Sequence, residues 1–483
     1  MPRLALLALA LALTPADSYN PAAVIPAEAL QGDLLALRHV LEQSHPGLYR
    51  YTPKPAMDRA FAAASSRAGR AMDERAFYAI VTALLARIGD GHTRAYPSGD
   101  FRKYLGTSAR RFPADLRLQG RRVIVVGGRC APIPRGSEIL GINGEPIGRI
   151  VDTMLAHISG DADILTGKYA AIGPGFATHY HMLVGYPRAF LVRYRDPAGK
   201  AGKATLMAIT PAELKEEEYL DATPSRAPMR FELVDGSRVG RLTIETFALP
   251  APDDGGPDVR KLLDSAFATM RGAGCQDLLI DLRGNDGGAP LGPLLFSYLT
   301  DRAVPFFDSV EAASVGFPLL HQYSHLDESF TDRITDHLIS TDTPGRFRPI
   351  ESPDLAPDPM TPQPDPFRGR VWVLIDGDVF STAAQFCSVV RSRHRGEFIG
   401  EETGGAYHGC SAGELVVITL PATKLKVVIP LLRYEMAGAD RSAARRGIVP
   451  EHPIAPTVEQ LLGGEDGAMA YALGVIARRR GGS

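Results

Sequence analysis

The sequence lacks an excess of either charge, a close-spaced set of cysteines and an internal repeat. Its formal net charge is −2 over 483 residues, so nothing in the composition indicates binding to nucleic acid or to an anionic membrane surface. Four cysteines do not form the framework of a small disulfide-rich protein. Cys387 and Cys410 could pair, or both could be buried thiols. The length predicts more than one domain.

Long apolar runs are also missing. The apolar run from Leu4 to Leu13 is too short to span a bilayer. No other stretch approaches the length of a transmembrane helix. It follows a basic Arg3 and precedes the small residues Thr14 and Ala16. This pattern predicts a signal peptide over residues 1–16, and therefore an exported protein, periplasmic or extracellular. An uncleaved anchor is the alternative.

A serine stands where a strand is expected to turn into a helix. The apolar run Val371 to Ile375 predicts a buried strand, and residues 376–378, Asp-Gly-Asp, predict a turn. Ser381 follows directly, before a helical pattern over Thr382 to Val390. A serine on such a turn can serve as a nucleophile beside the free N–H groups of the helix start. It also fits a plain helix N-cap.

A glycine-rich loop follows a second expected strand. Asp277 to Leu282 is largely apolar and leads into residues 283–288, Arg-Gly-Asn-Asp-Gly-Gly. Two strand–loop–helix units predict a mainly parallel sheet, with both loops at its carboxyl edge. The loop lacks the G-x-x-x-x-G-K-[ST] pattern of a P-loop. We therefore expect it to lie beside Ser381.

Three motifs together carry a resemblance: LLIDLRGNDGG, then FSTAAQF, then FIGEETGG. They resemble the tail-specific, or C-terminal-processing, serine peptidase family. The resemblance implies a crotonase-like/ClpP-like βα catalytic core over residues 225–465, with Ser381 as nucleophile. It implies an oxyanion hole formed by backbone N–H groups of Gly287, Gly288 and Thr382. Thr382 is the alternative nucleophile, because Gln385 occupies the place of the family's acid in Ser-x-x-Glu.

At the position of the general base, this sequence differs from the lysine-type members of that family. Residues 404–406 read Gly-Gly-Ala, without the expected lysine. The chain is more similar to the branch containing the tricorn protease core and retinoid-binding-protein-like members, whose base is a histidine. His92, in a D-G-H-T run after an expected helix, resembles that motif. Taken alone, His92 also fits an ordinary surface histidine, and His408 is the alternative base.

The partner that would orient His92 is less defined. By resemblance, Glu435 is favoured as the third member of a triad. The other candidates are Asp440, Glu401 and Glu402. We interpret His45 as structural.

A metal site is the remaining question for the histidines. His179 and His181 alternate like one face of a strand or short loop. No cluster of Cys, Asp or Glu accompanies them, so we expect neither a metal nor a cofactor.

The domain organisation expected is α/β, or α+β overall. Helical periodicity predicts an N-terminal helical region over residues 26–105. Residues 113–208 are expected to be β-rich and resemble a PDZ domain, with a hairpin at Asn143-Gly144. The Pro- and Asp-rich stretch 340–366 predicts a loop or flap.

The function expected from these features is that of an exported serine peptidase acting on a peptide or protein substrate. Two alternatives remain open: an inactive carrier for an apolar ligand or peptide, and a nonpeptide esterase. The sequence does not determine the oligomeric state.

Overall fold

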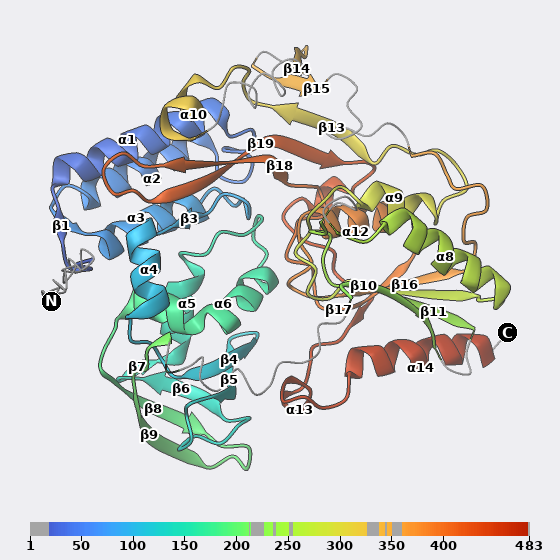
Figure 1. Cartoon of the computed structure of the whole chain (residues 1–483), viewed down its shortest axis with the longest axis horizontal. Coiled ribbons are helices and arrows are strands. Elements are labelled where there is room, and N and C mark those ends of the chain that lie inside the picture. Colours follow the sequence, from blue (N-terminus) through green and yellow to red (C-terminus); the bar gives the residue numbers. More distant parts are fainter. Residues whose placement is uncertain are drawn as a thin grey trace, which may run out of the picture.

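The computed structural model describes residues 19–211, 213, 227–234, 238–250, 255–325, 338–342, 345–349 and 360–481. The expected signal peptide, and residues 343–344 and 350–359 of the expected flap, lie outside these residues. Within them, no helix combines the length and apolarity needed to cross a bilayer. The described chain is a mixed α/β structure with several sheets (Figure 1).

The N-terminal part is helical, as its periodicity predicts. Its helices are α1 (Ala27–Ser44), α2 (Lys54–Arg67), α3 (Glu74–Ala86) and α4 (Gly99–Thr107), and its short strands are β1 (Val24–Ile25), β2 (Met72–Asp73) and β3 (Ala95–Tyr96). The Asp73 side chain caps α3 by accepting a hydrogen bond from the N–H of Ala76. The loop between α3 and β3 carries His92.

The next part is a β-rich unit. Its sheet has the order β4-β5-β6-β8-β9, with β7 paired to β6. The strands are β4 (Ala114–Gln119), β5 (Arg122–Gly128), β6 (Glu138–Ile142), β7 (Glu145–Pro146), β8 (Ala189–Arg195) and β9 (Ala201–Met207). The expected hairpin at Asn143-Gly144 is confirmed, because both residues have positive φ, at 50° and 86°.

The helices of this unit differ from the sequence prediction at His179 and His181. α5 (Ile147–Leu155) and α6 (Thr166–His179) precede a π-helical turn over Tyr180–Val184. His179 and His181 therefore lie on helical backbone and not on one face of a strand or loop. The described residues contain no group of His, Cys, Asp and Glu able to hold a metal ion.

The second half of the chain contains the parallel sheet that the two strand–loop–helix units predict. Its order is β10-β11-β12-β16-β17-β20, and every pair except β10–β11 is parallel. The strands are β10 (Met229–Leu233), β11 (Val239–Ile244), β12 (Asp277–Asp281), β16 (Arg370–Ile375), β17 (Glu397–Gly400) and β20 (His452–Pro453).

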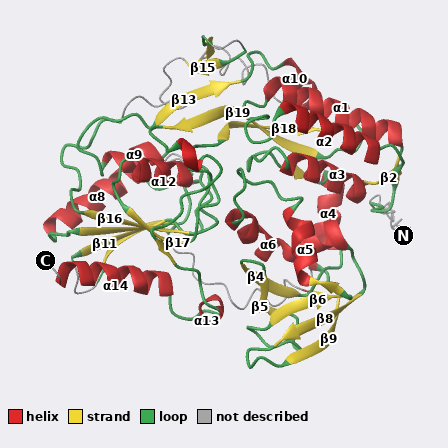
Figure 2. Ribbon diagram, turned by 180° about the vertical axis from the view of Figure 1, so that it is seen from behind, coloured by secondary structure: helices red, strands yellow, loops and turns green. Residues whose placement is uncertain are grey.

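Helices cover both faces of this sheet (Figures 1 and 2). On one face lie α8 (Val259–Gly272), α9 (Gly292–Ser297) and α12 (Thr382–Ser392), and on the other lies α14 (Gly467–Gly481), after the short α13 (Val458–Leu461). The apolar strands explain this arrangement: Leu278 and Ile280 pack toward α12, whereas Leu279 packs toward α14.

A second sheet joins this half of the chain to the N-terminal helices. Its order is β14-β15-β13-β19-β18, with β3 paired to β19. Its strands are β13 (Phe307–Ala312), β14 (Leu338–Ser340), β15 (Phe347–Pro349), β18 (Ser411–Thr419) and β19 (Lys426–Met436), with α10 (Pro318–Tyr323) and a 3₁₀ turn (Arg441–Ala443) nearby. Side chains of β18 and β19 share one core with α1 and α3. The histidine loop is therefore fixed against the half of the chain that contains Ser381.

The cysteines are all unpaired: Cys130, Cys275, Cys387 and Cys410 are free thiols. Of the two alternatives for Cys387 and Cys410, the buried-thiol interpretation is therefore the one observed.

Candidate active site

Two loops meet at the carboxyl edge of the parallel sheet. The loop after β12 carries Asn285 and the glycines, and the loop after β16 leads through Phe380 to α12. The N–H of Phe380 donates to the carbonyl of Asn285 at 3.1 Å. The N–H of Gly284 donates to the Asp376 carboxylate, also at 3.1 Å. These bonds hold the expected nucleophile loop and the glycine loop side by side.

Ser381 has the backbone of a sharp strand-to-helix turn. Its φ is 51° and its ψ is −128°, a region that residues other than glycine seldom adopt. Such a conformation costs about 1–3 kcal/mol and is typical of functional positions. Its side chain makes no capping hydrogen bond with α12. Ser381 therefore occupies the N-cap position of α12 but does not cap the helix through its hydroxyl.

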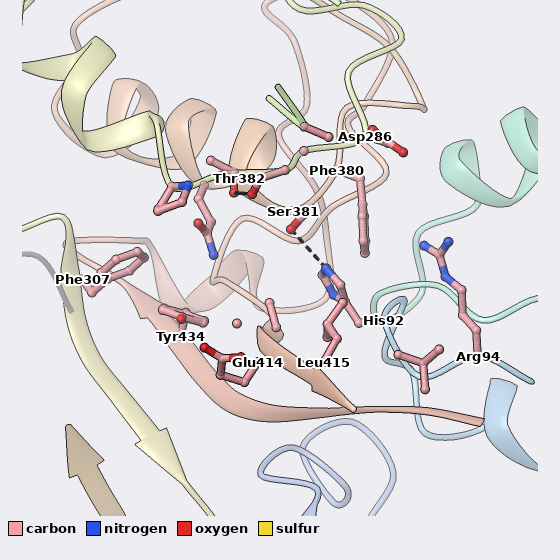
Figure 3. A pocket seen from close by; sticks show the side chains of 18 of the residues that line it. His92, Arg94, Asp286, Phe307, Phe380, Ser381, Thr382, Glu414, Leu415 and Tyr434 are labelled. Atoms are coloured by element: carbon pink, nitrogen blue, oxygen red, sulfur yellow. Dashed lines mark hydrogen bonds between the residues drawn. The ribbon is translucent and has the colours of Figure 1, made fainter. Parts of the chain in front are cut away.

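His92 lies opposite this serine (Figure 3). Its Nε2 atom is 3.1 Å from the Ser381 hydroxyl oxygen. The His92 ring packs against the ring of Phe380, with 4.6 Å between centroids. The aromatic ring preceding the serine thus fixes the imidazole plane.

The histidine loop is itself held by a buried carboxylate. Asp90 Oδ1 accepts hydrogen bonds from the N–H of His92 at 3.0 Å and from the N–H of Thr93 at 2.9 Å. The Thr93 hydroxyl donates to the same oxygen at 3.0 Å and lies 2.7 Å from Nε2 of His45. The structural role predicted for His45 agrees with this network. Sequence reasoning missed Asp90, although its place in the D-G-H-T run was a signal.

Burial controls the protonation of His92. Removal from water lowers its pKa to about 4, with Arg94 acting in the same direction and the Asp90 carboxylate opposing the shift. The imidazole is therefore neutral near pH 7. A neutral imidazole that carries its proton on Nδ1 can accept the serine proton at Nε2.

The structure does not place an acid beside the second nitrogen of His92. Nδ1 is buried and has no hydrogen-bond partner among the described residues. Glu435, expected there, instead accepts from Arg50 Nη2 at 3.0 Å and pairs with Arg433 at 3.1 Å. Glu435 is directed away from its expected place because two guanidinium groups lie close to it and compensate the charge of its half-buried carboxylate.

The other acids proposed for this role also have different partners. Asp440 caps the 3₁₀ turn through the N–H of Ser442, and Glu402 pairs with Arg446. Burial raises the pKa of Glu401, which lines a separate cavity near Arg283. Within the part of the chain that the structure describes, the site is thus a Ser–His pair without a third member.

Gly287 allows the loop to approach Ser381 closely, and Gly288 allows it to approach Ala248 closely. A Cβ atom on Gly287 would lie 2.6 Å from Cβ of Ser381, and one on Gly288 would lie 2.1 Å from the nitrogen of Ala248. Both residues also have positive φ, at 102° and 134°. No other residue type fits either position.

Only two of the three expected oxyanion donors are available. The N–H of Gly287 donates to Oδ1 of Asn285 at 2.9 Å, which corrects its assignment as a donor to substrate. In the part of the chain that the structure describes, the N–H groups of Gly288 and Thr382 donate to no acceptor. Sequence reasoning missed Asn285, which is fully buried and also donates to the Ile244 carbonyl at 2.9 Å.

Two alternatives from the sequence do not match the geometry. The Thr382 hydroxyl donates to the Gly288 carbonyl at 3.0 Å and is directed away from His92. His408 Nε2 lies 2.5 Å from the Asp440 carbonyl, and His408 does not line the cavity at Ser381. Neither residue is positioned for the role proposed for it.

A cavity of about 630 Å³ opens over Ser381 and His92. Its other walls come from the glycine loop, from β18 at Glu414 and Leu415, and from Tyr434 of β19 (Figure 3). A second cavity of about 550 Å³ lies beyond Phe380. Arg94, Tyr96, Asp286 and Phe380 line both cavities.

Comparison with solved structures finds a similar overall fold in mature CPAF. The structure of mature CPAF has a TM-score of 0.61 at 14% identity, covering 90% of this chain and 94% of that chain. A photosystem II D1 C-terminal processing protease gives 0.41 at 16% identity, covering 91% and 98%. A putative S41 protease from Bacteroides fragilis gives 0.39 at 15% identity, covering 91% and 96%.

The similarity is one of structure. No protein-family model and no curated protein matches the sequence. The chain is structurally similar to S41 family peptidases, which confirms the predicted resemblance at the level of the fold.

Proposed function

We propose that this chain is an exported serine peptidase in which Ser381 is the nucleophile and His92 the general base. The observation that carries the proposal is the 3.1 Å separation between Ser381 Oγ and His92 Nε2, with the serine on a strained turn. The structural similarity to S41 peptidases supports peptide bonds as the substrate class. Export rests on the N-terminal sequence pattern, and the PDZ-like assignment of residues 113–208 rests on its motif.

The first step is acylation of the serine. Ser381 Oγ attacks the carbonyl carbon of the scissile peptide while His92 Nε2 takes the hydroxyl proton. The N–H groups of Gly288 and Thr382 stabilise the resulting oxyanion, and one such donor is worth about 3 kcal/mol in the transition state. While the oxyanion exists, its negative charge raises the pKa of the His92 imidazolium.

The intermediate then collapses. The C–N bond breaks, and His92 delivers its proton to the leaving amine. A water molecule, deprotonated by His92, attacks the acyl carbon, and the returned proton regenerates the Ser381 hydroxyl. Both protons therefore move through Nε2 alone, because Nδ1 has no acceptor within the described chain.

Strand β18 offers a place for an extended substrate. It is an edge strand of its sheet, and its register shifts between Ala412 and Leu415, where it lines the cavity. Leu415 and Val417 are each 46% exposed on this strand. An extended peptide can pair with such an edge and direct a carbonyl at Ser381. This edge favours a peptide over a compact ester.

Labelling with a serine-reactive fluorophosphonate tests the proposal. The reagent should modify Ser381 and no other residue, and peptide mapping identifies the site. A folded protein that is never labelled would favour the carrier alternative. A labelled protein that cleaves esters but no peptide in a mixed peptide library would favour the esterase. The mature protein of the native host should begin near Asp17 outside the cytoplasm.

A further inference from the structure

Asp161 is a buried carboxylate that the reaction does not use directly. It lies in the loop between α5 and α6 and is 1% exposed. Two hydrogen bonds join the loop that carries Asp161 to the loop that carries His92. The N–H of Ala162 donates to the Gly89 carbonyl at 2.9 Å, and the Ser159 hydroxyl donates to the Thr93 carbonyl at 2.6 Å. Asp161 is thus fixed beside the segment that carries His92.

Its two oxygens bind two different loops. Oδ1 accepts the N–H of Gly91, the neighbour of His92, at 2.8 Å. Oδ2 accepts the N–H of Ala406 at 3.1 Å. Ala406 stands where lysine-type relatives are expected to carry their base. One carboxylate therefore joins the histidine loop to the loop that follows β17.

The second of these loops is bonded to the nucleophile segment. The N–H of Gly405 donates to the Val379 carbonyl at 3.0 Å. A Cβ atom on Gly405 would lie 2.5 Å from Cβ of Ala384 in α12. A path of hydrogen bonds thus runs from Gly91, next to His92, through the Asp161 carboxylate to the 405–406 loop and on to Val379, two residues before Ser381.

We propose that Asp161, as a carboxylate, is a positioning residue that sets the distance between His92 and Ser381. This inference rests on the proposed function and extends it to regulation by pH. Both oxygens must accept hydrogen bonds for the two loops to keep their spacing. A protonated carboxyl has one good acceptor oxygen, so protonation weakens one of the two bonds. Loss of the proton from Asp161 therefore activates the enzyme.

The surroundings of Asp161 place this change near neutral pH. Burial, followed by the neighbouring Asp90 carboxylate, raises the pKa of Asp161 to about 7, while its two N–H bonds and Arg50 oppose the shift. Among the described residues, Tyr51 and Cys410 also face it, and burial raises the pKa of both. These two groups remain uncharged at neutral pH.

The test measures the rate of Ser381 labelling by a fluorophosphonate between pH 4 and pH 9. In the unmodified protein, the rate should rise with pH through a midpoint near 7. Asp161→Asn presents one amide N–H₂ group to a backbone N–H, so it should lower the rate at pH 8 by about 10- to 100-fold. Asp161→Asn should also remove the rise in labelling rate near pH 7 (the limb near pH 7) and leave the rise near pH 4 that comes from deprotonation of His92.

Asp163→Asn is the matched control. Asp163 is two residues away, largely exposed, and pairs with Arg445, so this variant should keep the profile of the unmodified protein. Labelling of Asp161→Asn with an unchanged limb near pH 7 would overturn the inference and leave the peptidase proposal standing. Absence of any labelling in the unmodified protein would overturn both.

A folding failure of Asp161→Asn would leave the test decidable. The unmodified protein alone would still distinguish a limb near pH 7, which supports the inference, from a limb only near pH 4, which contradicts it. Asp161→Glu, which keeps a carboxylate, should then retain a limb above pH 6.

Discussion

His92 Nε2 and Ser381 Oγ lie 3.1 Å apart although 289 positions separate the two residues in the chain. Neither residue is brought there by its own element alone. The serine is set by the turn between β16 and α12, and the histidine is set by the loop between α3 and β3. The reactive pair therefore depends on how two halves of the chain pack.

Ser381→Ala should abolish hydrolysis and fluorophosphonate labelling while leaving the thermal midpoint within a few degrees, because the hydroxyl makes no capping bond. Activity assays and thermal unfolding check this. Ser388→Ala is a suitable control, since Ser388 is a buried serine of the same helix that donates to Ala384. Activity that survives Ser381→Ala but is lost in Thr382→Val would move the nucleophile to Thr382.

His92→Ala should lower kcat/KM by about a thousandfold or more, because it removes the imidazole whose Nε2 atom lies 3.1 Å from Ser381 Oγ. Glu435→Gln should stay within about tenfold, since Glu435 binds Arg50 and Arg433 rather than His92. The loss of an orienting acid in a triad costs about 10⁴. A loss of that size in Glu435→Gln would show that this carboxylate reaches His92 during the reaction. His408→Ala provides the comparison for a histidine outside the cavity.

Gly288→Ala should eliminate activity and lower the yield of folded protein. Its Cβ atom would lie 2.1 Å from the nitrogen of Ala248, at a φ of 134°. Gly284→Ala, four residues earlier, meets nothing within 4 Å and has a φ of 78°, so it should cost only about 1–2 kcal/mol of stability. Activity together with denaturant unfolding separates the two. If both variants lost activity and stability equally, the positive φ at Gly288, and not its close contact with Ala248, would be the reason for glycine at this position.

Acid stability should depend on His179. Burial lowers the pKa of this imidazole to about 4 in the folded protein, against about 6.5 in the unfolded chain. The unfolded state therefore binds more protons between these values, and the free energy of unfolding falls as pH drops from 6.5 to 4. The slope from one such group reaches at most about 1.4 kcal/mol per pH unit.

His179→Gln should flatten that slope in denaturant unfolding measured at several pH values. The same substitution at the exposed His39 serves as the control. An identical pH dependence in His179→Gln and the unmodified protein would contradict the prediction.

Much of the parallel sheet and the position of Ser381 could be predicted from the sequence. The apolar runs 277–282 and 371–375 each end in a turn, and two such units place their loops at one edge. The structure has β12 and β16 at these places. Local pattern was sufficient because each strand and its loop are contiguous in the chain.

The environment of His92 could not be predicted in the same way. Asp161 meets Gly91 across 70 positions and Ala406 across 245, and no periodicity records such contacts. Glu435 was favoured from its position after the serine, but its half-buried carboxylate lies beside Arg50 and Arg433. Which cation or imidazole an acid meets is decided by tertiary packing, in this case by the approach of β19 to the loop after α1.

The pairing of β3 with β19 has a consequence for the order of events during synthesis. Ala95 and Tyr96, just after the histidine loop, pair with Val427 and Lys426, and the N–H of Val428 donates to the Arg94 carbonyl at 2.8 Å. These partners leave the ribosome after both His92 and Ser381. A nascent chain already contains both reactive residues before it contains the strand that fixes one against the other. We therefore expect His92 to be held opposite Ser381 only after residues 426–428 have been synthesised.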